Sequence, residues 1–149
     1  MAIFQRPVLE LPPFGKLEYF SAYWRGSLLL EAFQKEFDLV VRAEREGPSS
    51  AQAAAMTRLL TDVAAIKSSA TEPMIDVHRR SGLMPDDLVG QPENIWNSLD
   101  PEEIEVSDAS YYDNGRIAIL MIFGSLLNTD FAPAIETADG QFMQVLDGT

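Results

Sequence analysis

A single long helix signal, from Ser49 to Arg80, lies between two blocks of strand-like sequence and constrains the fold more than any other feature. Ser49 and Gln52 have the spacing of a capping box, in which each side chain bonds the backbone N–H of the other residue. Apolar residues recur at the helical period and predict a face that lies on an apolar surface. This stripe consists of Ala53, Met56, Leu59, Leu60, Val63, Ile66, Ala70, Met74 and Val77. Pro73 interrupts the backbone bonding but not the stripe, so we expect either a bend or a restart capped by Thr71.

Alternation of apolar and polar residues, typical of strands, precedes this helix. Residues 1–13 contain three prolines, so we expect an extended lead-in that covers the edge of a sheet. A strand can begin in residues 15–23. Two antiparallel strands should follow over residues 24–32 and 37–43, with a turn around Gln34-Lys35.

A second block of strands follows the helix. Residues 102–112 alternate and run into Asp113-Asn114-Gly115, and Asn-Gly between two such runs predicts a tight hairpin. The next run, residues 116–124, is apolar on both faces, which predicts a central strand covered on both sides. Asp139-Gly140 predicts a second hairpin within residues 134–146.

This order of elements predicts an α+β fold, with a meandering antiparallel sheet packed on one long helix. Alternating β and α units, the pattern of a parallel sheet, do not occur. The 149 residues suffice for one domain with its own core, so we expect residues 1–149 to form a single α+β domain.

The charge and composition limit the classes of partner. Eleven lysines and arginines oppose 23 aspartates and glutamates, a formal net charge of −12, which argues against nucleic acid or membrane as a ligand and favours a basic protein. No cysteine is present, which excludes disulfides and thiolate chemistry and fits a reducing compartment. The first ten residues do not resemble a signal peptide, so we expect a soluble cytoplasmic protein.

The inventory of reactive residues predicts neither catalysis nor a cofactor or metal. The only histidine, His78, lies in the last helical turn, where a structural role is typical. The opposing hypothesis is an enzyme with a carboxylate-centred pocket around His78 and Asp76. Lys67 falls within the apolar stripe, so it either reaches past the helix edge to solvent or pairs with a buried carboxylate.

The charge distribution indicates more than any motif. Residues 81–115 contain nine acidic residues and no lysine or arginine. One interpretation is a solvated segment that keeps the protein soluble and protects a sheet edge, and a related one is an acidic structural or assembly protein. The other is a docking surface in which aromatic residues anchor a basic partner. The candidate partner-binding residues are Trp96, Glu102, Glu103, Glu105, Asp108, Tyr111, Tyr112 and Asp113.

Four features are combined in this chain: Trp24-x-Gly26, the strand Phe37-x-Leu39-x-Val41, the Ser49-Ser50-x-Gln52 helix start and an apolar strand before a final hairpin. This layout resembles that of small bacterial uncharacterised-domain proteins found beside polymorphic or type VI secretion toxins, many of them thought to be immunity proteins. The resemblance implies an immunity protein that binds and blocks a cognate toxin without chemistry of its own. It assigns no role to any individual residue.

Overall fold

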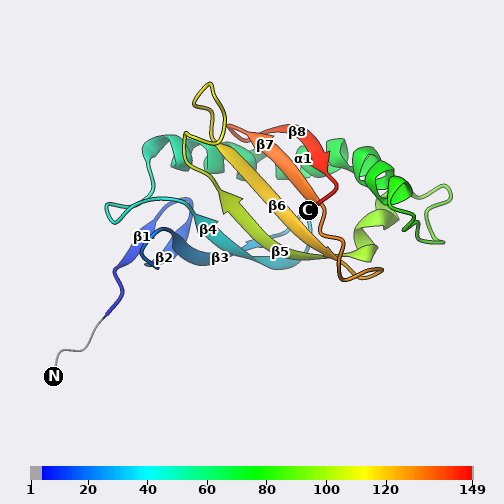
Figure 1. The fold of residues 1–149 in the computed structure, drawn as a ribbon, viewed down its shortest axis with the longest axis horizontal. Coiled ribbons are helices and arrows are strands. Elements are labelled where there is room, and N and C mark those ends of the chain that lie inside the picture. The colour runs from blue at the N-terminus through cyan, green and yellow to red at the C-terminus, as the bar shows by residue number, and fades with distance from the viewer. Residues whose placement is uncertain (1–4, 149) are drawn as a thin grey trace.

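The computed structural model describes residues 5–148 and has an α+β architecture, with an eight-stranded sheet, one long helix and a short 3₁₀ helix (Figure 1). In chain order the elements are β1 (Val8–Leu11), β2 (Gly15–Tyr19), β3 (Trp24–Leu30), β4 (Lys35–Val41), α1 (Ser50–Arg80), η1 (Pro92–Ser98), β5 (Leu99–Val106), β6 (Ala118–Ser125), β7 (Ala134–Ala138) and β8 (Gln141–Leu146). The predicted α+β class is therefore confirmed.

The strands lie in the sheet in the same order as in the chain. Every neighbouring pair is antiparallel except β4 and β5, which are parallel. The meander is thus interrupted once, where the chain passes through α1 between these two strands. The helical crossover carries the chain back across the sheet to the end at which β4 began, so β5 starts there and runs parallel to β4. The prediction of a wholly antiparallel sheet is wrong at this pair.

The predicted cap of α1 is confirmed. The backbone N–H of Gln52 donates to Ser49 Oγ at 3.1 Å, and the backbone N–H of Ser49 donates to Gln52 Oε1 at 2.9 Å. The same Gln52 side chain donates through Nε2 to the carbonyls of Arg42, at 2.8 Å, and Ser107, at 3.1 Å. One buried side chain therefore starts the helix and ties it to the ends of β4 and β5.

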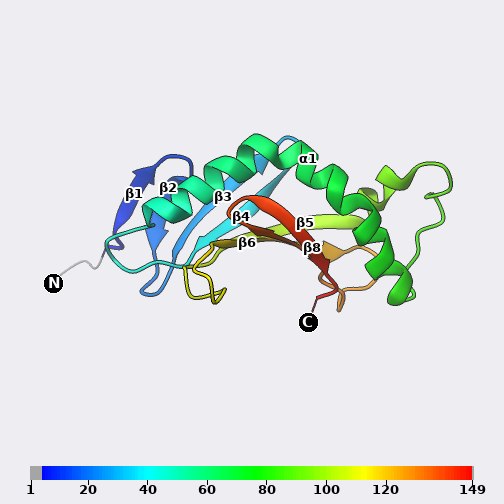
Figure 2. The ribbon, with the colours of Figure 1, turned by 90° about the horizontal axis from the view of Figure 1, so that it is seen from above.

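The helix continues without a break through Pro73 and follows an arc along the sheet (Figure 2). Thr71 caps no new helix, because its hydroxyl donates to the carbonyl of Lys67 at 2.9 Å, one turn earlier. The restart is therefore wrong. A proline inside a helix removes one backbone N–H donor. The helix tolerates this loss here because the apolar stripe packs on the sheet both before and after Pro73.

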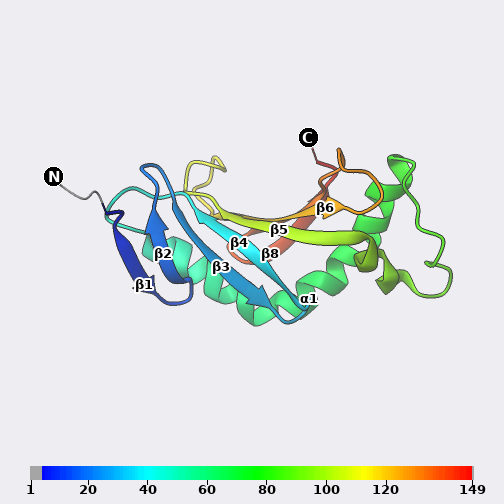
Figure 3. The ribbon, with the colours of Figure 1, turned by 90° about the horizontal axis from the view of Figure 1, so that it is seen from below.

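The core fills the space between α1 and one face of the sheet (Figures 2 and 3). Its largest fully buried side chains are Trp24, Phe14, Phe37, Phe123, Leu17, Leu39, Met56, Leu59, Met74, Ile95, Ile104 and Ile117. In the described residues, neither a helix nor a second sheet covers the other face, which is turned toward the viewer in Figure 1. We call it the open face.

The strands near the N-terminus are shorter than expected. The lead-in contributes β1, which pairs with β2 and forms one edge of the sheet; residues 1–4 lie outside the described part. The strand expected in residues 15–23 ends at Tyr19 because the chain turns at Ser21, whose φ is 74°. The turn between β3 and β4 includes Gln34, with a φ of 56°.

The first predicted hairpin turn is wrong, although β5 and β6 are antiparallel neighbours. They are joined by residues 107–117 and not by a two-residue turn at Asn114-Gly115. We call this segment the β5–β6 loop. The second hairpin is confirmed, since Asp139 and Gly140, with φ values of 50° and 81°, join β7 to β8. Both values suit the turn that matches the twist of a hairpin.

Strand β6 is central, as predicted, but only one of its faces is fully covered. Ile119 and Met121 are buried against the helix side. On the open face Leu120 and Ile122 are only half-buried. The prediction of cover on both sides is therefore wrong for this strand, which leaves apolar side chains partly exposed on the open face.

Candidate protein-binding face

Acidic residues from β4 and β5 lie side by side on the open face. Phe37 and Leu39 point into the core, so the alternation of β4 places Asp38 on the opposite side. Asp38 is paired with Glu103 of β5, and Glu103 is paired with Ile122 of β6. Across these three strands, the carboxylates of Asp38 and Glu103 therefore lie next to each other, and the half-buried side chain of Ile122 lies beside Glu103.

A bulge in β5 adds a further carboxylate to this face. The register with β6 shifts between Pro101 and Glu103, which leaves Glu102 as the extra residue. A Cβ atom placed on Gly124, which points to the open face, would overlap Glu102 Oε1. The carboxylate of Glu102 thus lies over Gly124, on the same side as Glu103. Adjacent residues of a regular strand would point to opposite faces, and the bulge removes that alternation.

Cations compensate only part of this charge. Arg42 pairs with Glu105 at 3.1 Å, and Arg25 lies 3.9 Å from Asp38. Within residues 5–148, Glu103 forms no ion pair. Burial raises the pKa of Glu103, and the neighbouring carboxylates of Glu105 and Asp38 raise this pKa further, against the opposing effect of the two arginines. The ionised form of Glu103 is therefore held at an energetic cost.

Glu102 is likewise free of ion pairs with the described residues, and its side chain is exposed. Together with Asp38, Glu103 and Glu105 it forms what we call the acidic strip. Leu120 and Ile122 lie next to this strip and are half-buried. The face thus combines uncompensated negative charge with apolar area, which is the composition of many protein-binding surfaces.

The β5–β6 loop projects on the open side of the sheet, at the end of β5 (Figures 2 and 3). Tyr112 in this loop donates its hydroxyl to the carboxylate of Glu136 in β7, which also accepts from Gln144 Nε2 at 3.0 Å. Burial raises the pKa of Tyr112, and the bond to Glu136 raises it further. Tyr112 is therefore an anchor of the loop, and its hydroxyl is already engaged within the protein.

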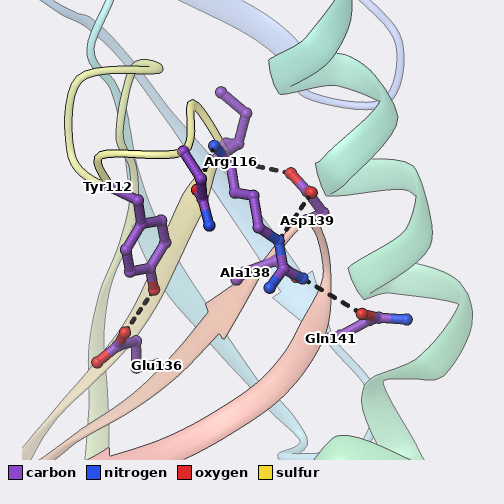
Figure 4. A network of polar contacts seen from close by, with 8 residues as sticks. Tyr112, Arg116, Glu136, Ala138, Asp139 and Gln141 are labelled. Carbon is purple, nitrogen blue, oxygen red and sulfur yellow. Dashed lines mark hydrogen bonds and ion pairs between the residues drawn. The ribbon is translucent and has the colours of Figure 1, made fainter.

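Arg116 holds the other end of this loop (Figure 4). Its guanidinium pairs with Asp139 at 3.1 Å and donates to the carbonyl of Ala138 at 3.1 Å. Asp139 also accepts from the backbone N–H of Ile117 at 2.9 Å. These bonds connect the loop to the β7–β8 hairpin, which is why it does not continue the strand ladder as the Asn-Gly signal predicted.

The remaining candidates in the loop are exposed. Tyr111 is 46% exposed and its ring stacks edge-on against Tyr112. Asp108 bonds the backbone N–H of Ser110 at 2.9 Å and also its hydroxyl, which lowers the pKa of Asp108. Asp113 is exposed. Of the aromatic candidates in this loop, only Tyr111 therefore presents a largely exposed ring.

Trp96 does not lie with the other candidates. It belongs to η1, at the end of β5 opposite to the β5–β6 loop. Its ring packs near Phe33 and Phe123, with centroids 5.4 and 5.6 Å away, and its Nε1 donates to Thr71 Oγ1 on α1 at 3.1 Å. Including Trp96 in one acidic surface was wrong, because sequence proximity to acidic residues does not show on which side of the sheet a ring packs.

The structure adds Asp38 to the predicted site. The alternation of β4 marks Asp38 as solvent-facing, but only the parallel pairing of β4 with β5 places it beside Glu103. Leu120 and Ile122 were also missed, because the apolar composition of β6 suggested that both of its faces would be covered.

The carboxylate pocket considered around His78 and Asp76 does not exist. His78 is fully buried, its Nδ1 lies 2.7 Å from the carbonyl of Met74, and its ring packs edge-on against Phe131. Asp76 is exposed and pairs with Arg79 at 2.8 Å. The two residues are close in the chain, but the helix turns His78 into the core and Asp76 toward solvent, so they share no cavity.

The fold and this face define a small α+β domain with an acidic, partly apolar open sheet surface. Residues 13–122 match the family model described as Domain of unknown function (DUF6985), which covers most of the chain. The chain therefore belongs to the DUF6985 family. No curated protein and no solved structure matches it.

Two further findings concern the part of the chain that the structure describes. Of its helices, none combines the length and the apolar character that a bilayer-spanning segment requires. Within residues 5–148, no group of three or more His, Cys, Asp or Glu side chains is arranged to hold a metal ion.

Proposed function

We propose that this chain is a binding protein without catalytic activity of its own, and that its open face docks a basic protein. The observation that carries the proposal is the position of Glu102 and Glu103. Both lie on an uncovered sheet face beside the half-buried Leu120 and Ile122, and neither forms an ion pair with a described residue.

Physical chemistry explains why such a face suits a basic partner. Like charges opposite each other on neighbouring strands destabilise a sheet. Burial is the main cause of the raised pKa of Glu103, and repulsion from Glu105 and Asp38 raises this pKa further. Lysine or arginine side chains of a partner would replace the repulsion with attraction and speed the encounter. Apolar area beside the charges would contribute affinity that charge alone does not supply.

We further propose that the partner is a cognate bacterial toxin and that the protein acts as its immunity protein in the cytoplasm. Toxins that act on nucleic acid need a positively charged surface for their substrate. An acidic inhibitor can occupy that surface through its own carboxylates. The net charge of −12 and the resemblance of the sequence layout to that of immunity-type proteins support this proposal.

The test is binding to the protein encoded by the adjacent upstream gene, purified as an inactive variant and measured by calorimetry at several salt concentrations. The variant Glu102→Lys/Glu103→Lys keeps the Arg42–Glu105 ion pair and reverses the uncompensated charges. We expect at least about tenfold weaker binding and a smaller salt dependence. The matched control, Asp62→Lys/Glu72→Lys, makes the same charge change on the exposed side of α1 and should bind like the wild type.

Unchanged affinity of the Glu102→Lys/Glu103→Lys variant would exclude the acidic strip from the interface. If the upstream gene product does not bind and the chain does not protect cells that express it, the immunity assignment is wrong.

A further inference from the structure

A cavity of about 430 Å³ lies away from the acidic strip, between the β3–β4 turn, α1 and η1. Its volume is within the range of pockets that hold small organic molecules. Phe33, Trp96 and Phe123 supply aromatic rings to its lining, which also includes the exposed Gln34 and Asn97. The cavity is therefore partly apolar, open to solvent and large enough for a ligand.

The charge of this cavity is opposite to that of the whole protein. Two of the three lysines of the chain, Lys35 and Lys67, line it, and within the described residues no carboxylate does. Lys35 is engaged with Asp100 at 2.8 Å, but Lys67 forms no ion pair with any described residue. In a protein of net charge −12, the lining of this cavity is therefore locally positive.

The geometry of Lys67 leaves donors free. Its Nζ donates to the carbonyl of Ala32 at 2.6 Å and lies 5.0 and 5.8 Å from the ring centroids of Phe33 and Trp96. An ammonium has three N–H donors, and within residues 5–148 only this one acceptor is hydrogen-bonded to it. The expected pairing of Lys67 with a buried carboxylate is not formed with any described residue, and its partly exposed side chain instead reaches past the helix to the carbonyl of Ala32.

We propose that this cavity binds a small organic carboxylate with a flat aromatic body. The carboxylate accepts from Lys67, the side-chain amide of Gln34 or Asn97 donates to its second oxygen, and the ring packs against Trp96 and Phe33. A charge-assisted bond to a partly desolvated ammonium and stacking on aromatic rings are both favourable. Burial lowers the pKa of Lys67, and the bound carboxylate would raise it again.

The probe for the test is phenylacetate, with phenylacetamide as its neutral analogue of the same shape. Spectra of the ¹⁵N-labelled protein contain one indole signal from Trp24 and one from Trp96, and the variant Trp96→Phe assigns them. We expect phenylacetate to shift the Trp96 signal saturably while Trp24, which donates to the carbonyl of Glu44 at 2.9 Å, stays in place. Phenylacetamide should bind about tenfold more weakly or worse.

Two lysine variants with the same charge change then separate the site from net charge. Lys67→Met should lose the preference for the carboxylate, whereas Lys16→Met, which lies outside the cavity, should keep it. Equal affinity for phenylacetate and phenylacetamide in the wild-type protein, or no saturable shift with phenylacetate, would overturn the proposal without any variant. A Lys67→Met protein that retains the preference would overturn it as well. The test needs no protein partner, so its result is independent of the proposed function.

Discussion

Tyr112 donates its hydroxyl to the carboxylate of Glu136, which fixes the β5–β6 loop to the middle of β7 on the open face (Figure 4). Glu136 is only 6% exposed, and Gln144 is its other hydrogen-bond partner among the described residues. A buried carboxylate needs such donors, because the charged form loses hydration without replacement. The Tyr112 hydroxyl is thus one of the anchors of the loop that borders the acidic strip, together with the bonds of Arg116 to the β7–β8 hairpin.

The variant Tyr112→Phe tests this anchor. It removes the hydroxyl and leaves Glu136 under-satisfied, so we expect the free energy of unfolding to fall by about 1–3 kcal/mol in urea titrations. Tyr111→Phe is the matched control, because the neighbouring ring is 46% exposed and should change stability little. Equal effects of the two substitutions would show that the Tyr112 hydroxyl does not hold the loop.

Gly140 allows the β7–β8 hairpin to approach the backbone of α1. A Cβ atom there would lie 2.7 Å from the carbonyl of Ala55 and 2.8 Å from the N atom of Leu59. Gly140→Ala should therefore destabilise the protein by more than the roughly 1–2 kcal/mol that a positive φ alone costs. Gly115→Ala is the control, since its φ is 77° but no atom lies within 4 Å of the added Cβ. Thermal or urea unfolding should show the larger loss for Gly140→Ala, and similar losses would argue against the close approach.

Glu103 should lower stability in its ionised form. Its raised pKa means that folding disfavours the charged carboxylate, so this penalty is present at neutral pH and disappears as pH falls through the raised pKa. We expect Glu103→Gln to unfold at higher urea concentration, with a gain of about 0.2–1 kcal/mol at pH 7 that shrinks toward acidic pH. Glu36→Gln, an exposed acid on the same face, is the control and should have a smaller effect. A less stable Glu103→Gln protein at pH 7 would contradict the argument.

His78 should make the protein less stable as pH falls, the opposite of the effect expected for Glu103. Burial lowers its pKa, against a smaller opposing effect of the bond to Met74, and its Nε2 has no partner among the described residues. The unfolded chain therefore binds a proton more readily, so stability is full above the unfolded pKa of about 6.5 and falls as pH drops below it. His78→Phe keeps a ring against Phe131 and removes the titration. Between pH 7.5 and 5.5, about one unit on either side of that value, the free energy of unfolding should fall more steeply for the wild type than for His78→Phe. If the free energy of unfolding depends on pH in the same way in both proteins, protonation of His78 does not destabilise the fold.

Much of the fold followed from local patterns. The capping box at Ser49 and Gln52, the helical stripe and the Asp139-Gly140 turn each depend on residues close together in the chain, and each is confirmed. The hairpin turn predicted at Asn114-Gly115 rests on the same kind of local pattern and is wrong. Tyr112 bonds Glu136, 24 residues further along the chain, and this long-range contact holds the loop away from the strand ladder. Local propensity decides a turn only where no long-range contact competes.

The candidate site depended less on local pattern. The sequence correctly marked Glu103 and Glu105 as alternating with core residues of β5, and both lie on the open face. It did not foresee that Asp38 would join them, since this requires the parallel pairing of β4 with β5 across the helix. Nor did it foresee that a bulge would place Glu102 on the same side, because periodicity assumes a regular strand.

By itself, then, the sequence determined the helix, its cap, the alternation of the strands and the large negative charge, all of which arise from neighbouring residues or from simple sums. Only the tertiary structure decided which charges share a surface. It also placed Lys67 beside Trp96 and Phe33 in a cavity without carboxylates, although these residues are far apart in the chain. Such juxtapositions depend on strand order and on the path of the connections, which the order of apolar and polar residues does not encode.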